Sequence, residues 1–461
     1  MSTKLIKGAL IVTEDANRKI YRKGDILIKG TKIAAIGEDL GNPEAEVIDG
    51  KGMIALPGFV DAHRHSWESL IRSVGVDWTL AQYMMAIKFV LGPLYTADDI
   101  YCATYLSAVE ALECGITTLF DWFHNINGPD FADAAIQGYK DAGIRCVLGY
   151  ANSVKGELPV SDYPMDYEDF RRVKKQYFSA KNDMMSLCLA TRGPQFETID
   201  LFLKEMKIAR EYDMFVTMNA GDGIWGKVRP IQQLKDLGLM DFDYTFVHCN
   251  TLSDEEIQMI GDMGAACVSC PEVELNMGHG YPPTLRELKA GIKPAFGVDV
   301  TTSVPSDMFG PMRFLLAGVR SVVNAEGLKT GEPIDPLPIL ATDVLHFATQ
   351  HGADACKMGD LTGSLTVGKE ADITLLDTCA ANLIPMNDPV GAIVEAAHTG
   401  NVDTVLVAGE FKKRNKKLVG VDMQLLSSRI EKARDGLFGR AGVPATGEWK
   451  PEPYRETPDS K

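Results

Sequence analysis

Two histidines separated by one residue, His63 and His65, stand at the end of a short apolar run that follows Leu56-Pro57-Gly58. The run 59–65 has the composition of a β-strand, in which residues two apart project to the same side. The two imidazoles should therefore point together, which is what a metal ion requires of two histidine ligands. Two ordinary loop histidines would have the same spacing, so the pair alone is a weak signal.

The chain between residue 59 and about residue 360 alternates short apolar strands with helical stretches. Helical patterns occupy residues 96–111 and 199–212, and Ser253 with Glu256 has the spacing of a capping box at a third helix start. Such an alternation, repeated eight times over roughly 250 residues, predicts an α/β fold of the (β/α)₈ type, a TIM-like barrel. The eight predicted strands are 59–65, 117–122, 145–150, 186–192, 215–221, 245–250, 266–271 and 293–300.

A doubly wound open sheet is the alternative to the barrel. It usually carries a glycine-rich phosphate loop after its first strand, and the residues after Val60 contain none. The barrel is therefore the favoured interpretation.

Both ends of the chain have β character. Residues 1–56 contain short alternating runs separated by turn residues, and similar runs return after residue 360. We predict one small β-sandwich domain, 1–56 plus 362–415, with the metal-dependent barrel 57–361 inserted between its halves. Residues 416–461 should form a C-terminal helix and an extended, proline-rich tail.

Functional groups of a TIM-like barrel sit at the C-terminal ends of its strands. Predicted strand six ends at His248 and strand eight at Asp299, so both should meet His63 and His65 at one mouth. Taken singly, His248 would be a core histidine and Asp299 a helix cap. The chain has only 8 histidines, and three at strand ends therefore indicate a metal site.

These motifs resemble those of the amidohydrolase superfamily. Within it, they are most similar to those of the cyclic-amidine deaminase and triazine-hydrolase branch. The resemblance covers nearly the whole chain up to about residue 410. Its motifs are residues 57–65, Gly115-Ile116-Thr117-Thr118, Val247-His248-Cys249-Asn250, Gly297-Val298-Asp299 and residues 363–373.

The resemblance implies a metal-dependent hydrolase that acts on a carbon–nitrogen bond other than a peptide bond. The reaction would be deamination, or amide or amidine hydrolysis, of a small cyclic or aromatic substrate by a metal-activated water. It further implies one divalent metal ion per chain, zinc with iron or manganese as alternatives, and a homodimer or homotetramer.

Residue roles also follow from the resemblance. His63 and His65 match the metal ligands of strand one, and Asp299 matches the strand-eight carboxylate that touches metal and water and moves a proton. His248 matches the strand-six histidine, which contacts the water or the substrate.

Strand five departs from the family pattern. Asn219 stands where the family has a histidine ligand, and an amide oxygen is a poorer zinc ligand than imidazole. Asp222, a shorter carboxylate, stands where many of these deaminases have a catalytic glutamate. His248 or His279 would be able to complete the ligand set, and loss of the metal is the remaining alternative. Strand four ends in Thr191-Arg192-Gly193 with no lysine for a bridging carbamate, which favours one metal over two.

The loops after the strands should line the substrate pocket, and their aromatic content suits a flat, unsaturated substrate. For any one tryptophan, packing beneath a loop is the alternative. The predicted substrate-binding residues are His279, Trp67, Trp78, Trp122, His124, Arg192 and Asp307.

The overall charge limits the partners. A formal net charge of −16 disfavours nucleic acids and anionic membranes, because both require a basic surface. No signal-peptide pattern and no apolar run of transmembrane length is visible, and the 9 scattered cysteines suit a reducing compartment. We therefore expect a cytoplasmic protein whose partner is a small-molecule substrate.

Two other classes of function fit the sequence less well. A zinc deaminase of the cytidine type needs H-x-E and P-C-x-x-C motifs, and Cys267-Val268-Ser269-Cys270 lacks the preceding proline. A non-catalytic, ligand-binding protein on the hydrolase scaffold is supported only by Asn219. The presence together of His63, His65, His248 and Asp299 argues against this class, because a scaffold protein has no use for such a cluster.

Overall fold

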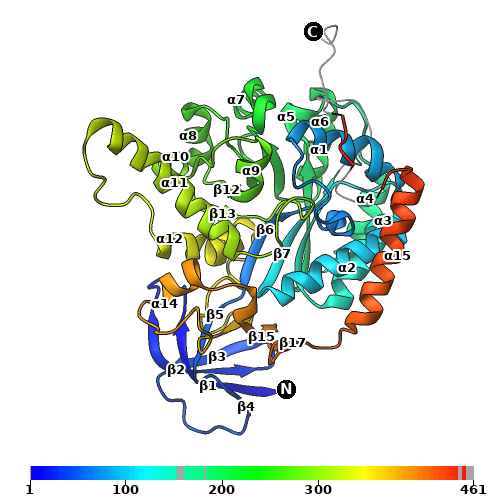
Figure 1. Ribbon diagram of the computed structural model, residues 1–461. Helices are drawn as coiled ribbons and strands as arrows, with labels where there is room; N and C mark the ends of the chain where they lie inside the picture. The colour runs from blue at the N-terminus through cyan, green and yellow to red at the C-terminus, as the bar shows by residue number, and fades with distance from the viewer. Residues whose placement is uncertain (1, 152, 154–159, 181–182, 445–448, 453–461) are drawn as a thin grey trace.

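The computed structural model describes residues 2–151, 153, 160–180, 183–444 and 449–452, and its centre is a sheet of eight parallel strands in sequential order (Figure 1). Helices surround this sheet, as a (β/α)₈ barrel requires. Its strands are β6 (Phe59–Arg64), β7 (Ile116–Phe123), β8 (Arg145–Ala151), β9 (Met185–Thr191), β10 (Val216–Ala220), β11 (Tyr244–His248), β12 (Ala266–Ser269) and β13 (Pro294–Phe296).

The ring closes between the first and last strands. His65 N donates to Asp299 O at 2.9 Å, and Asp299 N donates to His63 O at 2.9 Å. Gly297 permits this approach, because a Cβ at that position would lie 2.6 Å from the His63 carbonyl oxygen. The predicted barrel is confirmed. β13 is shorter than the predicted strand 293–300, and Asp299, with φ of 67°, leaves the extended conformation before that predicted strand ends.

The barrel interior is filled by small and branched side chains, which pack in layers. This internal cluster is Val60, Ala62, Phe120, Val147, Cys188, Val247, Ala266, Val268, Cys270 and Ala295, with Ala353, Ala355, Cys356 and Met358 closing one end.

The helices begin at the residues that the sequence marks. Thr96 and Ser253 each form a capping box, which fixes the starts of α2 (Ala97–Glu113) and α8 (Asp254–Asp262). The other helices are α1 (Leu80–Met84), α3 (Pro129–Ala142), α4 (Tyr167–Tyr177), α5 (Gly193–Phe196), α6 (Ile199–Glu211), α7 (Pro230–Asp236), α9 (Pro271–Met277), α10 (Thr284–Lys289), α11 (Phe309–Thr330), α12 (Ala341–His346), α13 (Gly352–Ala355), α14 (Pro389–Gly391) and α15 (Met423–Ala441). Short 3₁₀ or π turns are η1 (Ser66–Ile71), η2 (Met85–Leu91), η3 (Gly92–Leu94), η4 (Gly223–Val228), η5 (Phe347–His351), η6 (Ala392–Ala396) and η7 (Thr399–Asn401).

A second sheet of nine strands is built from both chain ends and lies beside the barrel (Figure 1). Its order is β17-β16-β15-β14-β5-β1-β2-β3, with β4 paired to β1. The small β domain of the predicted fold class is thus confirmed, whereas the exact domain boundaries stay a prediction. The strands are β1 (Thr3–Val12), β2 (Ile20–Lys29), β3 (Lys32–Gly37), β4 (Glu46–Asp49), β5 (Met53–Pro57), β14 (Ile373–Asp377), β15 (Val402–Val407), β16 (Glu410–Arg414) and β17 (Lys417–Leu418).

A buried ion pair joins the barrel to the second sheet. Arg145 at the start of β8 donates from Nε and Nη2 to the carboxylate of Asp372, at 2.8 and 3.0 Å. Asp372 also accepts a hydrogen bond from Ala408 N at 2.7 Å. The two sheets are therefore held in one orientation.

The C-terminal helix α15 packs along α2 (Figure 1). Most of the tail predicted for residues 444–461 lies outside the described residues. Among the described residues, none of the helices combines the length and apolar character needed to cross a bilayer.

Candidate active site

Three predicted metal ligands meet at the point where the barrel closes. His63 Nε2 and His65 Nε2 lie 3.5 and 3.4 Å from Asp299 Oδ1. His65 Nδ1 donates to the Trp122 carbonyl at 2.7 Å, which leaves Nε2 as the free acceptor nitrogen. His63 Nε2 is buried and has no hydrogen-bond partner among the described residues. An orphaned imidazole nitrogen, a free acceptor nitrogen and a carboxylate fit a divalent metal ion.

The backbone is strained where the strands deliver these side chains. Asp299, His248 and Cys249 have φ of 67°, 72° and 58°, in the left-handed region that non-glycine residues rarely adopt. Such conformations persist only where the surroundings over-determine them, and they cluster at functional sites.

Electrostatics keep the Asp299 carboxyl ionised. Burial alone raises its pKa, but the close approach of His63, whose Nε2 lies 3.5 Å away, and the charges of His248, His63 and His65 outweigh burial and lower the pKa below its usual value. In return, burial and the neighbouring His63 lower the pKa of His65 to about 3, so its imidazole is neutral, the form in which histidine binds a metal.

His248 lies next to this cluster, with Nε2 at 3.9 Å from Asp299 Oδ2. Its Nδ1 donates to Glu274 Oε1 at 3.1 Å. Burial disfavours the charged imidazolium, but the hydrogen bond to Glu274 and the charges of Asp222 and Asp299 outweigh it and raise the pKa of His248 to about 9. His248 is therefore arranged to present a proton on Nε2 to the mouth of the barrel.

The Asp222 carboxylate faces His279, with Oδ1 at 2.7 Å from His279 Nδ1, although the two atoms are not aligned for a hydrogen bond. Burial raises the pKa of Asp222, and the nearby His279 and His248 more than reverse this, so the net pKa is lowered. The ring of His279 lies 4.7 Å from that of His248. The structure thus brings these three predicted residues together beside the His63 cluster, the group formed by His63, His65 and Asp299.

Asn219 lies on β10 beside β11, paired in register with Val247. Its Oδ1 is buried and has no hydrogen-bond partner among the described residues. A buried amide oxygen without a partner is costly, so a ligand or an ion is expected to meet it.

Trp122, His124 and Trp67 form an aromatic wall against His65. The His124 and Trp122 rings lie 4.2 and 5.8 Å from the His65 ring. Trp67 is fully buried, and its Nε1 donates to His124 Nδ1 at 3.1 Å. Trp67 therefore supports His124 from behind, which is the packing alternative that the sequence left open.

The other predicted pocket residues lie further from the cluster. Trp78 packs edge-on against Trp449 at 5.4 Å, and Asp307 caps α11 by accepting a hydrogen bond from Gly310 N at 3.0 Å. Arg192 is buried and donates to the Ser153 carbonyl. No contact brings Trp78 or Asp307 to the His63 cluster among the described residues.

Sequence reasoning missed Glu274 as a partner of His248. Glu274 also accepts from Cys270 N at 2.7 Å and from Asn250 Nδ2 at 3.1 Å. The sequence signal for this contact is the pair of carboxyl residues directly after predicted strand seven, in Pro271-Glu272-Val273-Glu274.

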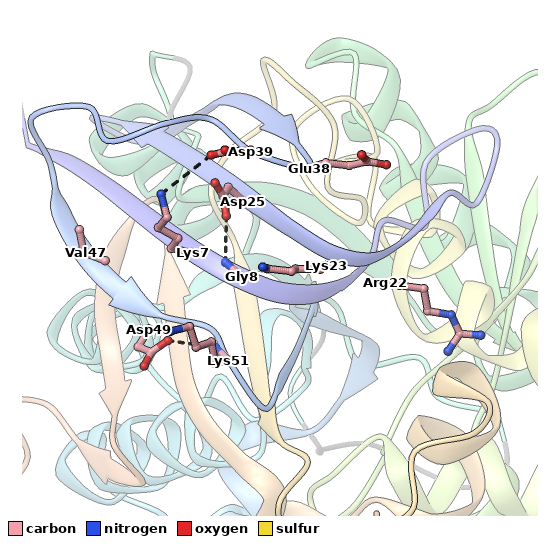
Figure 2. Close-up of a pocket in the computed structure, with 10 residues that line it drawn as sticks. All are labelled: Lys7, Gly8, Arg22, Lys23, Asp25, Glu38, Asp39, Val47, Asp49 and Lys51. Atoms are coloured by element: carbon pink, nitrogen blue, oxygen red, sulfur yellow. Dashed lines mark hydrogen bonds and ion pairs between the residues drawn. The ribbon is translucent and has the colours of Figure 1, made fainter.

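A hollow of about 800 Å³ on the small sheet is a different feature (Figure 2). Its lining mixes both charges, and Lys7 pairs with Asp39 at 4.0 Å across it. It contains none of the residues of the candidate active site.

Comparison with known proteins identifies the family. The model of the amidohydrolase family matches residues 54–412, and the chain belongs to that family. The prediction of a metal-dependent hydrolase of carbon–nitrogen bonds other than peptide bonds is confirmed at the level of class.

Relatives of similar length are deaminases. A 5-methylthioadenosine/S-adenosylhomocysteine deaminase of Thermoanaerobacter pseudethanolicus is 27% identical over 452 residues, which cover 95% of this chain and 99% of that protein. A 5'-deoxyadenosine deaminase of Methanosarcina mazei is 25% identical over 455 residues, with the same coverages of 95% and 99%.

Solved structures share the fold. An adenosine deaminase of Xanthomonas campestris with bound zinc superimposes with a TM-score of 0.83 at 24% identity, covering 95% of this chain and 99% of that one. The atrazine chlorohydrolase of Arthrobacter aurescens, as a mutant with zinc and atraton, also gives 0.83 at 24% identity, over 94% and 100% of the two chains.

Proposed function

We propose that the chain is a hydrolytic deaminase that removes an amino group from a ring amidine, with 6-aminopurine nucleosides as the first substrates to test. The observation that carries the proposal is the meeting of His63, His65 and Asp299 beside His248 and the Asp222–His279 pair. The curated relatives, which are deaminases of adenine nucleosides, support the substrate class.

His63, His65 and Asp299 would hold one divalent ion, zinc before iron or manganese, and the Asn219 amide oxygen would add a weak contact. When bound, such an ion lowers the pKa of water from 15.7 towards about 7. The aromatic wall of Trp122 and His124 would exclude bulk water from one side of the substrate ring.

The remaining steps are proton transfers and charge stabilisation by residues of this chain. Asp299 accepts a proton from the attacking water at its carboxylate. His248 donates from Nε2 and stabilises negative charge that develops on the substrate. Asp222 or Asp299 then delivers a proton to the leaving nitrogen, and His279 holds the Asp222 carboxylate in place.

Amide or amidine hydrolysis of a substrate other than a purine is the second candidate. It is favoured by Asp222, because a carboxylate one methylene shorter than glutamate reaches less far towards a ring nitrogen. A non-catalytic, ligand-binding role is the third, and only Asn219 supports it.

The test is turnover by metal-loaded protein. Adenosine, 5'-deoxyadenosine and 5-methylthioadenosine are incubated with the protein and with the Asp299→Asn variant, and released ammonia is measured. Ammonia from the wild type alone supports the proposal. A second panel of cyclic amides is followed by the appearance of the ring-opened carboxylic acid, because hydrolysis of a ring amide bond releases no ammonia. Ring opening in that panel without deamination of any aminopurine would move the assignment to the second candidate, and no turnover of either panel would contradict an enzyme of this class.

We also propose that the protein acts in the cytoplasm as a homodimer or homotetramer. Eight of its nine cysteines are buried free thiols, which suits a reducing compartment. Light scattering on the purified protein tests the oligomeric state, and a monomer would contradict it.

A further inference from the structure

Two thiols and a carboxyl group meet in the core outside the barrel mouth. Cys249 follows the end of β11, Cys267 lies on β12, and Glu287 lies on α10. The two sulfur atoms are 3.7 Å apart, and ligand atoms of all three residues lie within 4.8 Å of one another. All three side chains are 0% exposed.

Glu287 is the least satisfied member of this group. Both of its carboxyl oxygens are buried, and the weakly donating Cys267 thiol is the one hydrogen-bonding group that reaches them among the described residues. Thr284, one helical turn earlier on the same face of α10, has a buried hydroxyl without a partner among those residues. Buried carboxyl groups are normally paired or bound to a metal, so this arrangement calls for a missing partner.

The spacing of the sulfur atoms matches a tetrahedral zinc site. With zinc–sulfur bonds of about 2.3 Å and tetrahedral angles, two thiolates lie about 3.8 Å apart. The observed separation is 3.7 Å. A carboxylate oxygen from Glu287 and the Thr284 hydroxyl, or a water, would complete four ligands.

We propose that Cys249, Cys267 and Glu287 form a second, structural metal site for a thiophilic divalent ion such as Zn²⁺. Two thiolates and a carboxylate supply three negative charges to one dication, and soft thiolate donors select zinc over magnesium or calcium. Burial, followed by the nearby charge of Glu274, raises the pKa of Glu287 to about 8, so the pocket disfavours a carboxylate that no cation balances.

This site would act on the active site through the backbone. Cys249 directly follows His248, and both residues hold left-handed conformations, with φ of 58° and 72°. Cys249 N donates to Ala220 O at 2.8 Å, which ties it to the end of β10. A metal ion bound to the Cys249 thiolate would fix this turn, and with it the orientation of His248.

The first measurement is the metal content of the full-length protein loaded with zinc and freed of excess ion. The proposal expects two equivalents of zinc per chain in the wild type and one equivalent in either His63→Ala or Cys267→Ser. The double variant His63→Ala/Cys267→Ser should bind none. One equivalent in the wild type would overturn it, because the site would then hold a buried water or a thiol–carboxyl contact only.

Cobalt replaces zinc for the second measurement, since thiolate-bound cobalt has a near-ultraviolet charge-transfer absorption. Glu287→Gln keeps the size of the side chain, and it should weaken the site without removing its thiols. The absorption should survive His63→Ala and the control Cys356→Ser, which removes a buried thiol elsewhere. It should disappear in Cys249→Ser and Cys267→Ser.

Cys270 provides the sharpest control, because its thiol lies near His248 and Glu274 on the active-site side. If the absorption is lost in Cys270→Ser and kept in Cys267→Ser, the proposed site is wrong. X-ray absorption at the zinc edge of the His63→Ala protein gives a check that needs no cysteine variant. Two sulfur neighbours at about 2.3 Å are expected, and a shell of nitrogen and oxygen alone would contradict the site.

Discussion

His65 and Asp299 are linked twice, once through the backbone and once through the side chains. His65 N donates to the Asp299 carbonyl at 2.9 Å, and His65 Nε2 lies 3.4 Å from Asp299 Oδ1. The first contact closes the barrel and the second begins the metal cluster. Because both depend on the same two residues, the geometry of the site is set by the closure of the fold and not by a flexible loop.

Removing either imidazole of strand one should abolish metal binding at the cluster of His63, His65 and Asp299. His63→Ala or His65→Ala leaves two of the three predicted ligands, and activity should fall by more than about 100-fold, the upper range for losing an outer-shell partner. The fold should remain, because the closing hydrogen bonds at residues 63 and 65 use backbone atoms. Metal analysis, ammonia release and far-ultraviolet circular dichroism check this. Full activity in either variant would contradict the metal mechanism.

The sequence predicted the residues whose placement depends on local rules. His63 and His65 share a side because strand residues alternate, and His248 and Asp299 converge because parallel strands end at one mouth. It did not predict that Glu274 supports His248, since that contact depends on how α9 packs over the barrel. The sequence did not predict the role of Trp67 either. An aromatic residue that follows a strand can line a pocket or pack beneath the loop, and the local sequence does not distinguish the two.

The Arg145–Asp372 pair should be a strong contributor to stability. Both residues are buried, so Asp372→Ala would leave the Arg145 guanidinium between the two sheets with only the longer ion pair to Glu370, at 3.9 Å, and the cost should be up to about 3–5 kcal/mol. Chemical denaturation should show a lower midpoint. The double variant Arg145→Met/Asp372→Leu should recover part of the loss, since it removes the stranded charge. Equal stability of Asp372→Ala and the wild type would show that the pair contributes nothing.

His351 should make the protein sensitive to mild acid. Burial, followed by the nearby His346 charge, lowers the pKa of His351 to about 4, and its Nδ1 donates to Pro294 O at 3.1 Å. The unfolded state therefore binds this proton near pH 6.5 and the folded state does not. Stability is lost as the pH falls from about 6.5 to 4, by at most about 3 kcal/mol from this residue.

The variant His351→Gln isolates that contribution, because glutamine retains a hydrogen-bond donor and does not titrate. Its unfolding free energy should fall less steeply than that of the wild type between pH 6.5 and 4. Above pH 7 the two curves should run parallel. Identical slopes across the acid range would show that His351 takes up its proton equally in both states.

Asn219→His should tighten the binding of the divalent ion at the His63 cluster. The residue lies on β10 with a buried Oδ1 that lacks a partner among the described residues, and imidazole is a better zinc ligand than an amide oxygen. We expect an affinity gain of about tenfold or more, which corresponds to about 1.4 kcal/mol. Chelator competition measures it, with Asn219→Ala as the control that should bind no more tightly than the wild type. An unchanged affinity in Asn219→His would mean that residue 219 does not face the metal, and that His248 or His279 completes the ligand set.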